Sequence, residues 1–106
     1  MQPLLSSLDA NGRQTAAILP SGHHMAIRLD IGAEKTVAVP SGASTVSITA
    51  TDDVWVGFGR PASVPAVDIL DGSAPELNPS VRALQGVATI GLAAPRACTV
   101  SLGFFR

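Results

Sequence analysis

The dominant pattern along the chain is an alternation of apolar and polar residues over short segments. In residues 45–51, threonine and serine alternate with Val46, Ile48 and Ala50. Because successive side chains of a β-strand point to opposite faces, this pattern predicts a strand with one buried face. A period of two recurs in the ranges 26–31, 36–39, 54–59, 87–92 and 98–105. The longer period of an amphipathic helix is almost absent.

The turn residues between these segments predict how the strands connect. Asp52 and Asp53 separate residues 45–51 from residues 54–59, so we expect these two strands to form a hairpin. A proline-containing turn at 93–96 separates the last two strands.

Proline weakens one further expected strand. Residues 64–70 are apolar enough for a strand, but Pro61 and Pro65 restrict its pairing because proline has no N–H to donate. Residues 71–84 form the one long irregular stretch, for which we rank an extended course above a short helical turn.

The alternation also assigns side chains to faces. Within residues 26–31 we expect the apolar positions to face inward: Ile27, Leu29 and Ile31. Within residues 54–59, Trp55 lies on the face opposite Val54, Val56 and Phe58. The pattern leaves open which of these two faces is buried. Trp55 is therefore a core residue, a subunit-interface anchor or a platform for stacking a sugar.

Many short strands with turns every 8–12 residues are typical of sandwiches and small barrels. A length of 106 residues fits one domain. We therefore predict an all-β fold over residues 13–106, a single antiparallel β-sandwich of jelly-roll-like form with about eight short strands. Residues 1–12 lack a strong strand pattern and are expected to be an N-terminal arm or a frayed segment.

Charge and composition argue against several classes of function. Charged residues make up only 14% of the chain and the net charge is −1, so we expect no nucleic-acid partner. No apolar stretch approaches the ~20 residues of a spanning helix, and the N-terminus lacks the basic region of a signal peptide. We expect no membrane partner, and synthesis in the cytoplasm.

The residues that usually carry chemistry are isolated. His23 and His24 are neighbours, so in a strand they point to opposite faces and do not share a metal ion. Cys98 is the one cysteine and occupies an inward strand position without a neighbouring base. Three acidic residues near a glycine lack the spacing of a calcium site: Asp68, Asp71 and Glu76. We predict no catalytic residue, no metal site, no cofactor and no enzymatic activity.

Scarce charge gives the sequence its most informative surface feature. Threonine, serine and alanine fill the outward strand positions, whereas a lone soluble β-protein usually protects its edges with lysine and glutamate. This composition favours packing against copies of the same chain or a larger assembly. The candidate interface residues are Trp55, Phe105, Leu4, Leu5, Leu8 and Leu77.

Three stretches carry a resemblance to a known class of proteins. They are a strand, Pro-Ser-Gly turn and strand over residues 37–50, the Trp-containing strand at 53–59 and the closing strand at 97–102. Together they resemble the small all-β accessory proteins of tailed-bacteriophage and prophage particles.

The resemblance implies a structural protein of the virion, made in the cytoplasm of the bacterial host. The first expectation is a head decoration protein that binds the assembled shell, as a homotrimer or other homo-oligomer, in contact with the major capsid protein or other virion proteins. Residues 1–12 would add a strand to a neighbour. The alternatives are a neck, tail or fibre component of the virion, and a glycan-binding module for host attachment.

Overall fold

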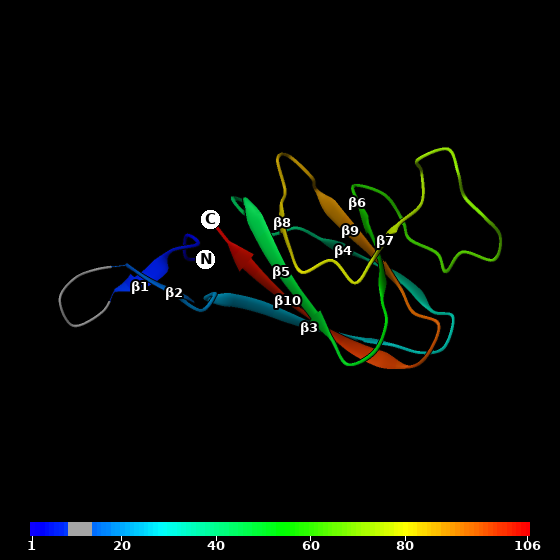
Figure 1. Ribbon diagram of the computed structural model, residues 1–106, viewed down its shortest axis with the longest axis horizontal. Helices are drawn as coiled ribbons and strands as arrows, with labels where there is room; N and C mark the ends of the chain where they lie inside the picture. Colours follow the sequence, from blue (N-terminus) through cyan, green and yellow to red (C-terminus); the bar gives the residue numbers. More distant parts are fainter. Residues whose placement is uncertain (9–13) are drawn as a thin grey trace.

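The computed structural model describes residues 1–8 and 14–106, which form ten β-strands and contain no helix (Figure 1). The strands are β1 (Ser6–Leu8), β2 (Gln14–Ile18), β3 (His23–Leu29), β4 (Glu34–Ala38), β5 (Thr45–Ala50), β6 (Trp55–Phe58), β7 (Glu76–Leu77), β8 (Val81–Ala83), β9 (Thr89–Ala93) and β10 (Cys98–Phe105). All six strands that the alternation predicts are present, with ends shifted by up to three residues.

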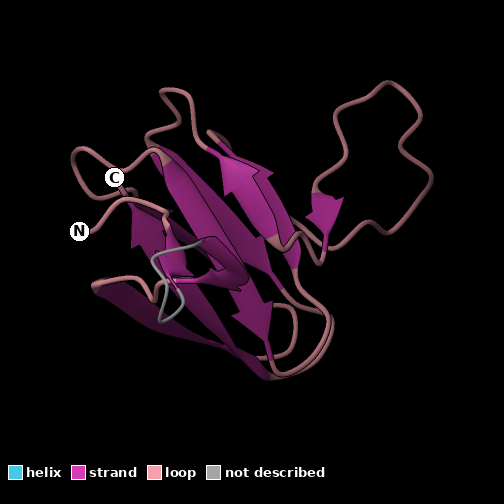
Figure 2. Ribbon diagram, turned by 60° about the vertical axis from the view of Figure 1, so that its left-hand side comes forward, coloured by secondary structure: helices cyan, strands magenta, loops and turns pink. Residues whose placement is uncertain are grey.

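Eight of these strands form two four-stranded antiparallel sheets. The first has the order β3-β10-β5-β8 and the second β4-β9-β6-β7. The two sheets lie face to face (Figure 2) and enclose one cluster of apolar side chains. The predicted all-β antiparallel sandwich is confirmed.

The core follows the alternation of each strand. Along β10, Val100, Leu102 and Phe104 are each fully buried, while Ser101 between them is exposed. Burying such a side chain contributes roughly 1.5–3 kcal/mol. The largest fully buried side chains of the core are those of Phe104, Leu29, Leu84, Ile90, Leu92, Leu102, Val46, Val54, Val56 and Val100.

The connections differ from the sequence prediction. β5 pairs with β10 and β8, whereas β6 pairs with β9 and β7 in the other sheet. The predicted hairpin of β5 and β6 is therefore wrong, and Asp52 and Asp53 carry the chain from one sheet to the other. The proline-containing turn after β9 makes the same kind of crossing.

Three local predictions are also settled. The expected strand at 64–70 is wrong, because this prolyl segment is a loop between β6 and β7. The expected extended course of residues 71–84 is confirmed by β7 and β8. The inward position of Ile31 is wrong: β3 ends at Leu29, and Ile31 stands 76% exposed in a turn with Gly32, whose φ is +70°.

The N-terminal residues divide between the sandwich and a separate hairpin. β1 and β2 pair only with each other and extend away from the sandwich (Figure 1). Gln2 forms a parallel bridge with Phe105 beyond the end of β3, and its carbonyl oxygen accepts a 2.7 Å hydrogen bond from the Arg106 N–H. The predicted boundary between residues 12 and 13 lies outside the described residues.

Candidate functional site

The loop between β6 and β7, residues 59–75, begins by lying flat on the outer face of its sheet. Gly57 and Gly91 are partners in the β6–β9 register. A Cβ atom built on Gly91 would lie 2.5 Å from the Arg60 carbonyl oxygen, and one on Gly57 would lie 2.7 Å from the same oxygen. The backbone of residues 60–62 therefore fits only because neither position has a side chain. We call this contact the glycine clamp.

Beyond the glycine clamp the loop projects from the sandwich (Figure 2). This part of the loop exposes apolar side chains. Val67 is 76% exposed and Leu70 is 90% exposed. The sequence prediction missed both as interface residues because it placed them in a strand. Pro61 and Pro65 were the available signal that this segment is a loop.

Short-range hydrogen bonds order the base of this loop. The Asp71 carboxylate accepts hydrogen bonds from the Ser73 N–H at 3.0 Å and the Ser73 hydroxyl at 2.6 Å. Both bonds lower the pKa of Asp71, and the bond from the Ser73 hydroxyl lowers it most. The Ser73 carbonyl oxygen in turn accepts a 3.4 Å hydrogen bond from Arg60. The backbone contact with the sheet and the hydrogen bonds across the base of the loop therefore both hold it in place.

Trp55 lies on the outer face of the second sheet. Val54 and Val56 on either side of it are each 1% exposed and face the core, so Trp55 points outward and is half-buried. This removes the alternative in which Trp55 is a core residue. Its partner in the β6–β7 register is Leu77, which is 48% exposed. The loop 59–75 joins the two strands that carry this pair.

A second exposed apolar group lies where the N-terminal hairpin meets the sandwich. Leu4, Leu5 and Leu19 are 37%, 51% and 38% exposed, and the Leu19 N–H donates a 2.7 Å hydrogen bond to the Leu5 carbonyl oxygen. Leu8 belongs to β1, and its side chain lies outside the described residues. Phe105 is only 3% exposed and does not belong to the free surface. Its backbone neighbour across an isolated parallel bridge is Gln2.

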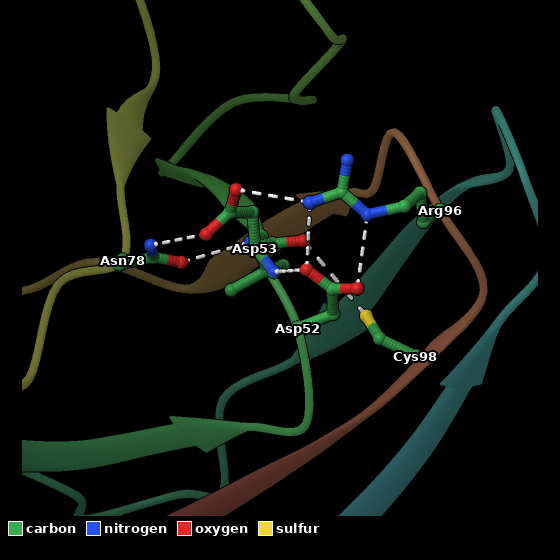
Figure 3. A network of polar contacts seen from close by, with 6 residues as sticks. Asp52, Asp53, Asn78, Arg96 and Cys98 are labelled. Carbon is green, nitrogen blue, oxygen red and sulfur yellow. Dashed lines mark hydrogen bonds and ion pairs between the residues drawn. The ribbon is translucent and has the colours of Figure 1, made fainter.

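Charged side chains meet at the crossing between the two sheets (Figure 3). Arg96 donates hydrogen bonds to both oxygens of Asp52 at 3.0 and 2.9 Å, and one to Asp53 at 3.3 Å. Asn78 donates to Asp53 at 2.9 Å and accepts from the Val54 N–H at 2.9 Å. The network ties the crossing after β5 to the turn before β10 and to the segment between β7 and β8.

The pKa shifts in this network indicate a structural role. The Arg96 hydrogen bonds, followed by the Asp53 N–H, lower the pKa of Asp52 to about 2. Burial raises the pKa of the Cys98 thiol, and the charge of Asp52 raises it further by a smaller amount. This cysteine is therefore not activated as a nucleophile. A cavity of about 310 Å³ opens beside the network, lined by Ile48, Ala50, Asp52, Asp53, Val54, Asn78, Pro79 and Ser80. The Asp53 and Asn78 side chains on its rim already hydrogen-bond each other.

The two histidines point to opposite faces, as predicted. His23 packs edge-on against Phe104 with ring centroids 6.0 Å apart. His24 is exposed on the outer face, and its Nε2 lies 2.6 Å from the Ser21 carbonyl oxygen. Across residues 1–8 and 14–106, no group of three or more histidine, cysteine or acidic side chains is placed to hold a metal ion. The same residues contain no helix with the length and apolarity needed to span a bilayer.

The comparisons with known proteins find no family model that matches the chain, no similar curated protein and no similar solved structure.

Proposed function

We propose that this chain is a non-enzymatic structural protein of a phage particle, a decoration protein that binds the outside of the assembled shell as a homo-oligomer. The observation that carries the proposal is the apolar loop at 64–70. Its Leu70 is 90% exposed on a loop that the glycine clamp holds in place. Apolar groups that gather on one exposed element favour a site of protein–protein contact.

The shape of the chain supports a binding role for its projecting parts. The radius of gyration is 15.2 Å, whereas a compact domain of this length has one of about 13 Å. The loop 59–75 and the β1–β2 hairpin project on different sides of the sandwich (Figure 1). A chain of this shape reaches two neighbours on a shell at once, through Leu70 on the loop and through Leu5 at the base of the hairpin.

The order of the strands supports the same proposal. We infer that the sandwich is a jelly roll, because its chain crosses between two four-stranded sheets at almost every connection. Double-sheet jelly rolls of eight strands are used in viral capsid and lectin domains.

The test is occupancy of the chain on particles. An affinity-tagged copy is expressed in the bacterium that carries the gene while phage or prophage particles are produced, and purified heads are analysed by quantitative mass spectrometry. Leu70→Asp removes an apolar contact worth roughly 1.5–3 kcal/mol, so occupancy on shells should fall about tenfold or more. Ile31→Asp is the matched control, because Ile31 is likewise an exposed aliphatic residue, at 76%, but lies in the turn between β3 and β4.

Two results would contradict the proposal. One is absence of the chain from purified heads, and the other is equal occupancy of the wild-type chain and the Leu70→Asp variant. Immunogold labelling of intact particles separates the head from the neck, tail and fibres. Labelling of the tail would contradict a decoration protein and support a neck, tail or fibre component instead.

The outward position of Trp55 favours one further candidate, a glycan-binding module. A half-buried indole on the outer face of a sheet offers a ring for a sugar to stack on. A glycan array with the wild-type chain and Trp55→Ala tests this function. Saturable binding that Trp55→Ala abolishes supports it, and the absence of any bound glycan removes it.

A further inference from the structure

One edge of the sandwich lacks the protection of the other three. The edge strands are β3 and β8 of the first sheet, and β4 and β7 of the second. β7 and β8 have only two and three residues, with Pro79 between them, and β4 begins with the charged pair Glu34 and Lys35. β3 has seven residues, no proline and a single charged side chain, that of Arg28. Long, flat and weakly charged edges are the ones that pair with another strand.

The hydrogen bonds identify which backbone groups of β3 point to the open edge. The Arg28 carbonyl oxygen accepts a 2.6 Å hydrogen bond from the Lys35 ammonium group, so it points away from β10. In an antiparallel strand the N–H and C=O of one residue point to the same side, and alternate residues share that side. Ala26 and His24 therefore also direct their N–H and C=O groups to the open edge. Among the described residues, no partner binds the backbone groups of Ala26.

We propose that this edge binds a second copy of the chain, through antiparallel pairing of β3 with β3 about a twofold axis at Ala26. This names the self-contact of the homo-oligomer and in that respect rests on the proposed function. In this register Ala26 lies opposite its own copy, His24 opposite Arg28, and Met25 opposite Ile27. The two four-stranded first sheets become one continuous sheet of twice that width.

The side chains of β3 suit this register on both faces. On the inner face, Met25 and Ile27 are half-buried at the open side of the core, so the pairing places apolar groups against apolar groups. On the outer face, the small Ala26 lies at the axis, where two copies of a charged side chain would repel each other. The residue opposite Arg28 is His24, so no lysine, second arginine or carboxylate of β3 faces it. The edge is thus complementary to itself, which is what a twofold contact requires.

The first test compares two proline substitutions in the full chain. Ala26→Pro removes an N–H that points to the open edge and leaves the pairing of β3 with β10 intact. Ala38→Pro is the matched control on β4. The Val39 N–H donates a 2.9 Å hydrogen bond to the carbonyl oxygen of Ala88, the residue before β9, so the N–H of the neighbouring Ala38 also points to an open edge. Sedimentation velocity over a dilution series should show a dimer for the wild type and Ala38→Pro. Ala26→Pro should weaken the dimer at least about tenfold.

The second test fixes the register. Hydrogen-bonded antiparallel partners have Cα atoms about 5.5 Å apart, within the roughly 4.4–6.8 Å range of a disulfide. Ala26→Cys should therefore give a disulfide-linked dimer when treated with oxidised glutathione. Ala38→Cys should not, and the wild-type chain, whose Cys98 is 7% exposed, is the blank.

A wild-type chain that stays monomeric, a dimer that Ala26→Pro leaves unchanged, or an Ala26→Cys chain that does not cross-link would overturn the proposal. Retention of the wild-type unfolding midpoint in urea confirms that Ala26→Pro still folds, and the cross-link does not depend on that variant. Head occupancy is measured separately. A confirmed dimer that is absent from heads would refute the proposed function alone, and a head-bound chain that never dimerises would refute this inference alone.

Discussion

At the scale of single residues, the scarce charges of this chain serve to fix crossings between the sheets. Arg96 reaches Asp52 and Asp53 from the turn before the last strand. In the sequence this aspartate pair resembles plain turn residues, because the partner of Asp52 lies 44 residues further along the chain. The polar role of the pair becomes visible only when the fold brings the two turns together.

The Asp52–Arg96 contact predicts a specific response to pH. The pKa of Asp52 is lowered to about 2 in the folded chain, against an unfolded value of about 3.9. Its stabilising effect is therefore complete above pH 4 and is lost as the pH falls from about 4 towards 2. Arg96→Gln should return the pKa of Asp52 towards its ordinary value, which carboxyl-detected NMR titration measures.

Asp71 is the internal control for that titration. Its lowered pKa comes from Ser73 and not from arginine, so it should be the same in both chains. An unchanged pKa of Asp52 in the Arg96→Gln variant would contradict the assigned cause. The difference in urea midpoint between the two chains should be constant from pH 5 to 7 and shrink below about pH 4.

At the scale of elements, the alternation of side chains identified the strands but not their neighbours. A period of two shows that a strand has one apolar face, and the strands of both sheets in a sandwich bury one face in the same way. The pattern in residues 45–59 therefore fits a hairpin as well as a crossing. For the same reason it could not show that Gln2 pairs with Phe105 or that the Phe105 side chain is buried, and it placed Phe105 among the interface candidates. The exposed positions of Leu4, Leu5 and Leu77 needed no pairing information and are present in the structure.

The glycine clamp predicts an unusual cost for a small substitution. Gly91→Ala places a methyl group 2.6 Å from the Ala62 nitrogen and 2.5 Å from the Arg60 carbonyl oxygen. Both contacts are with backbone, so the loop must lift, at a cost of typically 1–3 kcal/mol. Urea unfolding should show this loss for Gly91→Ala. Gly22→Ala is the control, because its Cβ would lie at least 3.5 Å from every neighbour and its φ is not positive. Equal stability of the two variants would show that the clamp does not hold the loop.

At the scale of the whole molecule, the chain is organised by contacts between its distant parts. The seven residue pairs of β3 and β10 join His23–Leu29 to Cys98–Phe104. β5 inserts on the other side of β10, and consecutive strands mostly lie in different sheets. Alternation in the sequence predicted the class of fold, but the order of strands depends on these distant pairings, which leave no local signature.

This organisation predicts slow folding. Loop closure must come before β10 can pair with β3 or β5, and chains dominated by such distant pairings fold in milliseconds to seconds.

Trp55 is the one tryptophan of the chain and is half-buried next to the glycine clamp, so its fluorescence reports formation of the second sheet. Far-ultraviolet circular dichroism in the same stopped-flow experiment reports both sheets. The two signals should change together with one rate constant, because neither sheet can bury its apolar face without the other. A fluorescence change in microseconds, or a tryptophan signal that develops before the dichroism, would mean that β6, β7 and β9 form a stable sheet on their own. Measuring the rate for Ala26→Pro at low concentration keeps pairing between copies from contributing to it.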